Sequence, residues 1–162
     1  MPRMMRWTWL ALACALATVA RADEVGPKRA SEIVDLAAAP NVPCPYLGPN
    51  SIVFDTRVLA NGGTLPFTIP PGRVLVVTAA TLTGAGVTPG ISIQSRLYKG
   101  SLVGNQAFAR RESVANELGR YEHQYQLASG SVIATDAIVC ADLNVPNAGT
   151  FGHLSGYLTK DK

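Results

Sequence analysis

Residues 68–83 read TIPPGRVLVVTAATLT, and they carry the clearest structural signal in the chain. The Pro-Pro-Gly that begins at Pro70 predicts a turn, because proline fixes φ and glycine accepts the positive φ that many turns need. The segment that follows, Arg73 to Thr83, is rich in valine, leucine and threonine and has no helix cap. This composition is typical of a central, buried β-strand, so we expect the rest of the chain to form a sheet around it.

Other short segments of β-rich or alternating composition surround this strand, and Gly, Pro and Asn residues separate them. The expected strands are residues 52–59, 65–69, 73–83, 91–99, 102–110, 121–127, 132–141 and 150–159. Residues 111–120 are polar and have no clear assignment. About eight strands with regular turn spacing predict an all-β fold, an antiparallel β-sandwich of the jelly-roll type, over residues 51–162.

An N-terminal arm is expected before this domain, at residues 23–50. It includes a short helix over Ala30–Ala39, because Pro27 and Pro40 stand where helix boundaries allow proline. We expect this helix to cover an open end or edge of the sheet, with contact to a partner protein as the alternative. The prolines of residues 40–50 exclude regular structure there and predict an extended segment.

Residues 1–22 have the composition of a signal peptide. Arg3 and Arg6 give a positive start, Trp7 to Ala20 is apolar but too short to span a membrane, and an Ala-x-Ala cleavage site ends at Ala22. We therefore predict cleavage after Ala22, a secreted or periplasmic protein, and no transmembrane segment in the mature chain. The alternatives are an uncleaved membrane anchor and lipidation of Cys14.

Charge and cysteine content constrain the mature chain further. The predicted signal holds three arginines and no acid, so its removal lowers the formal net charge from +3 to zero. A neutral chain has no electrostatic attraction to nucleic acid. Cys44 and Cys140 remain, and two cysteines in an exported chain predict one disulfide.

The sequence contains few side chains suited to catalysis or metal binding. His123 and His153 are the two histidines, and neither a Gly-x-Ser-x-Gly motif nor a histidine-rich metal motif is present. A hydrolase triad would have to bring one histidine next to Asp136 or Asp142. The loop at residues 142–147 offers three oxygen side chains, fewer than calcium needs. We expect no cofactor and no metal, and we lean against an enzyme.

Aromatic and polar residues alternate in YEHQYQL, residues 121–127, so Tyr121, His123 and Tyr125 share one face. In the favoured interpretation this face packs on the core, because the opposite orientation would bury Glu122 without a partner. In the other interpretation Tyr121, His123 and Tyr125 point outward and bind a flat sugar or peptide ligand.

The sequence therefore predicts an exported, non-catalytic β-sandwich protein that acts as a binding or structural module. One alternative is a carbohydrate-binding module that uses the Tyr121–Gln126 face, and another is an extracytoplasmic hydrolase. The expected partners are a glycan, a protein ligand or a second copy of the chain, since open sandwiches have edges to cover.

Overall fold

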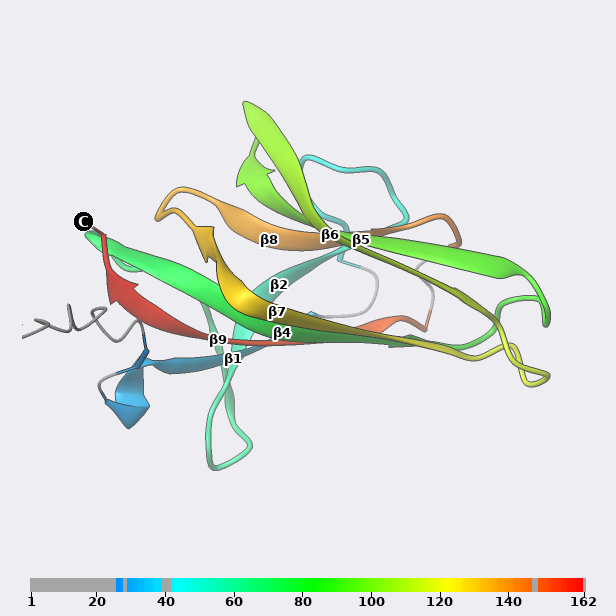
Figure 1. Cartoon of the computed structure of the whole chain (residues 1–162), viewed down its shortest axis with the longest axis horizontal. Coiled ribbons are helices and arrows are strands. Elements are labelled where there is room, and N and C mark those ends of the chain that lie inside the picture. The colour runs from blue at the N-terminus through cyan, green and yellow to red at the C-terminus, as the bar shows by residue number, and fades with distance from the viewer. Residues whose placement is uncertain (1–25, 28, 39–41, 147–148, 162) are drawn as a thin grey trace, which may run out of the picture.

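The computed structural model describes residues 26–27, 29–38, 42–146 and 149–161. The fold is all-β, with a single antiparallel sheet of nine strands that is nearly closed into a barrel (Figure 1). The elements are a 3-10 turn η1 (Ala30–Glu32) and the strands β1 (Ile33–Ala38), β2 (Ser51–Val58), β3 (Thr64–Pro66), β4 (Arg73–Gly84), β5 (Ser92–Ser101), β6 (Gly104–Val114), β7 (Tyr121–Ile133), β8 (Ile138–Leu143) and β9 (Phe151–Lys160).

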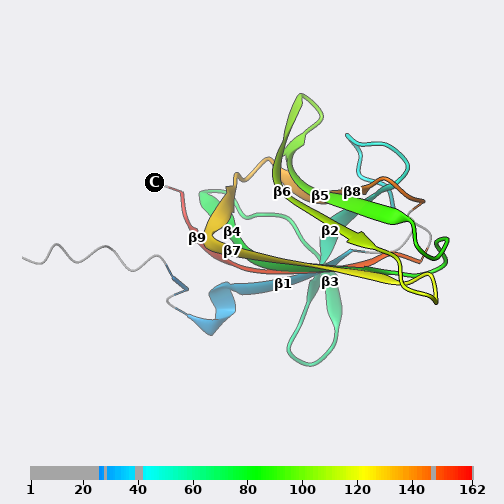
Figure 2. The same cartoon turned by 45° about the vertical axis from the view of Figure 1, so that its right-hand side comes forward.

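The strands are hydrogen-bonded in the order β6-β5-β8-β2-β1-β9-β4-β7, and β3 adds to β2. Two layers face each other: β6, β5 and β8 lie above β9, β4 and β7 in Figure 1, and the turned view in Figure 2 agrees. β2 joins the layers, because Ser51–Val53 pairs with β8 whereas Phe54 and the residues after it pair with β1.

β4 is the central strand that the sequence predicts. Arg73 N–H donates to the carbonyl of Pro70 at 3.1 Å, and Gly72 has a φ of 69°, so the Pro-Pro-Gly segment makes the expected turn. The strand then pairs with β9 on one side and with β7 on the other. Val74 to Val77 are all buried.

The main core fills the space between the layers with side chains from both. Burying one such aliphatic or aromatic side chain contributes about 1.5–3 kcal/mol, so this core is the chief source of stability. Its fully buried members include Val34, Leu36, Ile52, Leu75, Val77, Leu82, Leu97, Ile133 and Leu154.

The N-terminal segment differs from the expected helix over Ala30–Ala39. Residues 30–32 form one 3-10 turn, and Ile33–Ala38 forms β1 between β2 and β9. The sequence of β1 is IVDLAA, and its alternate residues Val34, Leu36 and Ala38 are buried. Hydrogen bonding to two neighbouring strands, with one apolar face on the core, therefore outweighs a weak local preference for helix.

Two later boundaries also differ from expectation. β6 continues to Val114, through part of the segment that had no clear assignment. β7 continues through the turn expected at residues 128–131, where the register with β4 steps from Val77–Ser131 to Ala79–Gln126. This step leaves extra residues on β7 and makes a large bulge in place of a turn. The chain instead turns at Ala134–Ala137, before β8.

The predicted disulfide joins Cys44 to Cys140, with a Cα–Cα distance of 5.9 Å. It fixes the irregular segment 42–50 against β8 and β2, where Cys44, Cys140 and Val53 form a small buried cluster with Tyr46 and Leu47. A disulfide within the chain is compatible with an extracellular location. Within the described residues, no helix has both the length and the apolar character needed to cross a membrane.

Candidate functional site

Tyr121, His123 and Tyr125 point from β7 into the space between the layers. Their exposed fractions are 6%, 3% and 2%. The intervening residues Glu122 and Gln124 are exposed. This is the core-facing orientation that the alternation favours, so the three rings do not form an open platform on the surface.

A buried hydrogen-bond network surrounds His123. Its Nδ1 is hydrogen-bonded to Ser95 Oγ of β5, and its Nε2 lies 2.7 Å from Ser113 Oγ of β6. Ser95 Oγ also shares a hydrogen bond of 2.5 Å with the Tyr125 hydroxyl. The network therefore links β5, β6 and β7 through side chains alone.

Electrostatics keep this network uncharged. Burial lowers the pKa of His123, and the nearby Arg111 guanidinium lowers this pKa further. Burial raises the pKa of the Tyr121 and Tyr125 hydroxyls. Each buried polar side-chain atom in the described part of the chain has a hydrogen-bond partner, so the network carries no uncompensated polar group.

The Ser113–His123 contact has the spacing of a nucleophile and a general base, but the third group differs from that of a hydrolase. Ser95, not a carboxylate, is hydrogen-bonded to Nδ1. Neither Asp136 nor Asp142 is hydrogen-bonded or ion-paired to a histidine within the described residues, and His153 is exposed on the other side of the sheet. Among the same residues, no group of three His, Cys, Asp or Glu side chains could hold a metal ion.

One group of accessible polar side chains lies on the outer side of the layer that contains β9, β4 and β7. The register places them in short rows across β7, β4 and β9. We call this surface the outer polar face, and its members are Glu122, Gln124 and Gln126 of β7, Thr81 and Thr83 of β4, and Phe151, His153 and Ser155 of β9. Phe151 is 58% exposed and stands next to Thr83, which is itself next to Glu122.

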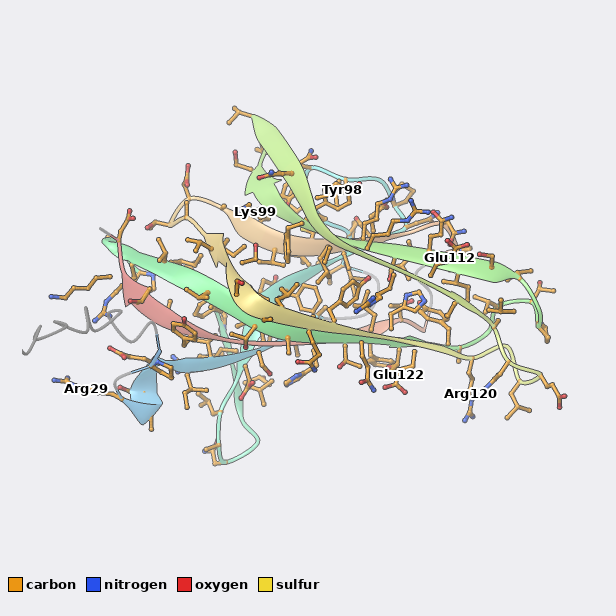
Figure 3. The ribbon with its side chains drawn as sticks, in the orientation of Figure 1. Arg29, Tyr98, Lys99, Glu112, Arg120 and Glu122 are labelled. Atoms are coloured by element: carbon orange, nitrogen blue, oxygen red, sulfur yellow. A yellow bond between two sulfur atoms is a disulfide. The ribbon has the colours of Figure 1, made fainter. Side chains whose placement is uncertain are left out.

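Hydrogen bonds hold several of these side chains in place. Gln124 Nε2 donates to Glu122 Oε1 at 2.6 Å, and Ser155 Oγ donates to Asp35 Oδ1 at 2.7 Å. Figure 3 shows Glu122 pointing away from the space between the layers, on the side toward which the β2–β3 loop projects. The face therefore presents amides, hydroxyls, one carboxylate, the imidazole of His153 and the ring of Phe151 on three adjacent strands.

Phe151 is not predicted as a site residue from the sequence, although the alternation along β9 contains a signal for its orientation. Gly152 follows it, and a Cβ at Gly152 would lie 2.7 Å from the ring of Phe54. Gly152 and Leu154 therefore belong to the inner side of β9, which leaves Phe151 and His153 on the outer side.

Comparison with known proteins adds no functional assignment: no protein-family model matches the chain, and no curated protein matches it significantly.

Proposed function

We propose that this protein is an exported, non-catalytic binding module whose outer polar face holds a carbohydrate. The observation that carries the proposal is the exposed ring of Phe151 at one end of rows of hydrogen-bonding side chains on adjacent strands. An aromatic ring offers a large rigid apolar surface against which the apolar side of a sugar ring can lie. The proposal places the sugar on the side of β7 opposite to Tyr121, His123 and Tyr125.

The chemistry of the neighbouring side chains supports a sugar as the ligand. Each sugar hydroxyl both donates and accepts, and amide and hydroxyl side chains can do the same. Gln124, Thr81 and His153 lie in one row across the strands, with Glu122 and Thr83 in the next. A ligand lying along these rows would meet donors and acceptors on adjacent strands and the ring of Phe151 at one end.

The strand order supports a jelly-roll interpretation of the fold. Eight strands divide into two groups of four, β6-β5-β8-β2 and β1-β9-β4-β7, as two interleaved Greek keys would arrange them. Jelly rolls include lectin domains, so this topology is compatible with sugar binding without requiring it.

Export is the other part of the proposal. The predicted signal peptide at residues 1–22 supports it, and so does the Cys44–Cys140 disulfide, because such bonds form and persist in oxidising compartments. We propose that the mature protein is secreted or periplasmic.

A glycan array probed with the oxidised mature protein tests the function. We expect binding to at least one glycan and roughly tenfold weaker binding by Phe151→Ala, since losing a stacked ring removes on the order of 1.4 kcal/mol. Val114→Ala is the matched control, because Val114 is 64% exposed but lies on β6, outside the outer polar face.

A third variant separates the two sides of β7. Tyr125→Phe removes the hydroxyl inside the barrel, keeps the ring, and should leave glycan binding unchanged. If no glycan binds, or if Phe151→Ala binds as well as the unmodified protein, the outer polar face is not a sugar site. Loss of binding in Tyr125→Phe alone would place the ligand on the inner side of β7 instead.

A further inference from the structure

A second surface lies at the other layer, between the irregular segment 42–50 and the β5–β6 hairpin. It is an open groove of about 320 Å³, close to the lower end of the usual size range for small-molecule sites. We call it the arm groove, and its lining consists of Pro45, Tyr46, Ser101, Leu102, Val103, Asp136 and Ile138.

One wall of the arm groove is held in place by a hydrogen bond and a disulfide. The Tyr46 hydroxyl donates to the carbonyl of Ile138 at 3.0 Å, and the Cys44–Cys140 disulfide joins the same two segments. Burial raises the pKa of Tyr46 to about 12, so its hydroxyl stays protonated as a donor at neutral pH. This wall therefore presents a preformed surface.

The opposite wall is the tip of the β5–β6 hairpin. Leu102 is 79% exposed and Val103 is 98% exposed. Tight hairpin turns favour Asn, Asp or Gly, so two large apolar residues at this tip are not explained by turn formation. Adjacent exposed apolar side chains beside a groove offer nonpolar contact area to a ligand.

Among the described residues that line the groove, Asp136 is the one that carries a charge. It lies in the turn Ala134–Ala137, which Ala137 N–H closes by donating to the carbonyl of Ala134 at 3.1 Å, and the Thr135 hydroxyl fixes this turn to the carbonyl of Arg73 at 2.7 Å. Within the described residues the Asp136 carboxylate makes no hydrogen bond and no ion pair. The ammonium group of Lys99, labelled in Figure 3, donates to the carbonyl of Val132 and forms no ion pair with Asp136.

We propose that the arm groove binds a small organic cation that combines a nonpolar body with an ammonium group. The body would lie against Leu102 and Val103, and the ammonium would lie next to Asp136. The ring of Tyr46 adds an aromatic face that attracts a cation. This site is separate from the outer polar face, so its test does not depend on glycan binding.

An NMR titration of the ¹⁵N-labelled, oxidised mature protein tests this proposal with two small molecules that have the same nonpolar body. Phenethylammonium carries the charge, and phenethyl alcohol has the same body without it. We expect saturable chemical-shift changes at residues 101–103 and 136–138, and roughly two- to fivefold tighter binding of the ammonium, the range expected for a solvent-exposed ion pair.

Two variants divide the contributions of charge and apolar surface. Asp136→Asn should weaken the ammonium to the affinity of the alcohol and leave the alcohol unchanged, whereas Val103→Ser should weaken both. Glu122→Gln removes an exposed carboxylate on the outer polar face and is the charge control. Equal affinity of the two probes, shifts centred elsewhere, or the absence of saturable shifts would overturn the proposal.

Discussion

Glycine at position 84 leaves room for the ring of Tyr121. The two residues are paired across β4 and β7, and a Cβ built on Gly84 would lie 2.3 Å from the nearest ring atom. The ring position also serves the hydroxyl, which shares a hydrogen bond of 2.7 Å with Thr150 Oγ1. Because Gly84 has no side chain, the ring of Tyr121 can lie over β4. Its hydroxyl then reaches Thr150, in the loop that precedes β9.

Gly84→Ala should lower the free energy of unfolding by about 1–3 kcal/mol, because the added methyl group forces the Tyr121 ring or the strand pair to move. Urea unfolding followed by circular dichroism measures the effect. Gly104→Ala is the control, since a Cβ at Gly104 meets nothing within 4 Å. Equal stability of the two variants would show that the Tyr121 ring relaxes without penalty.

At the scale of single elements, β4 is predictable and β1 is not. A run such as VLVVTAATL has one consistent interpretation, because β-branched and aliphatic residues fill a strand that is paired on both sides. The six residues of β1 are too few to distinguish the burial period of a strand from that of a helix. The prolines on either side of this segment are also compatible with helix boundaries. β1 is a strand because it pairs with two strands that are distant in sequence. Asp35 pairs with Val58 of β2 and with Ser155 of β9.

In the candidate site, the orientation of the β7 side chains is predictable from the sequence, whereas the partners of His123 are not. Alternation along β7 and the cost of burying Glu122 predict that Tyr121, His123 and Tyr125 face inward. The serines that hold His123 cannot be predicted, because they are 28 and 10 residues away in sequence and approach only when β5 and β6 pack against β7. Alternation with Ile93 and Leu97 predicts that Ser95 faces inward, but no local pattern links it to His123, and none distinguishes Ser113 from the other serines of the chain.

The disulfide ties the irregular segment 42–50 to β8. Removing it with the double variant Cys44→Ala, Cys140→Ala should lower the free energy of unfolding by about 2–5 kcal/mol, because the unfolded chain regains the freedom of a 96-residue loop. Urea unfolding with and without a reductant measures this. The reductant should destabilise the unmodified protein and leave the double variant unchanged. Identical midpoints for all four samples would contradict a stabilising role.

At the scale of the whole molecule, the barrel has one seam. β6 and β7 are the two ends of the strand order, and side chains connect them where they meet. Arg111 Nε donates to the carbonyl of Gln124 at 3.0 Å, and Ser113 is hydrogen-bonded to His123. No backbone pairing joins the two strands within the described residues, so side chains close the barrel: these polar contacts, together with Phe108 and Ala109 of β6, which pack on the main core.

Closure of this seam should depend on pH through His123. The charged and titratable groups around its ring are Arg111 of β6 and Tyr121 and Tyr125 of β7, whereas Ser95 of β5 and Ser113 of β6 are neutral. Burial and the Arg111 charge lower the folded-state pKa of His123 below its ordinary value of 6.5. As the pH falls from 6.5 toward that lower pKa, the unfolded chain binds more protons than the folded chain, so the free energy of unfolding must decrease.

We therefore expect urea unfolding between pH 7.5 and 5.5 to show stability that is full above pH 6.5 and declines below it. The informative quantity is the slope of the free energy of unfolding against pH. The absolute value is less informative, because His123→Gln also removes hydrogen bonds and lowers stability at every pH. That variant should have a flatter slope, whereas His153→Gln, which changes an exposed histidine, should keep the slope of the unmodified protein. If His123→Gln and the unmodified protein lose stability in parallel, a group other than His123 governs the acid sensitivity of the barrel.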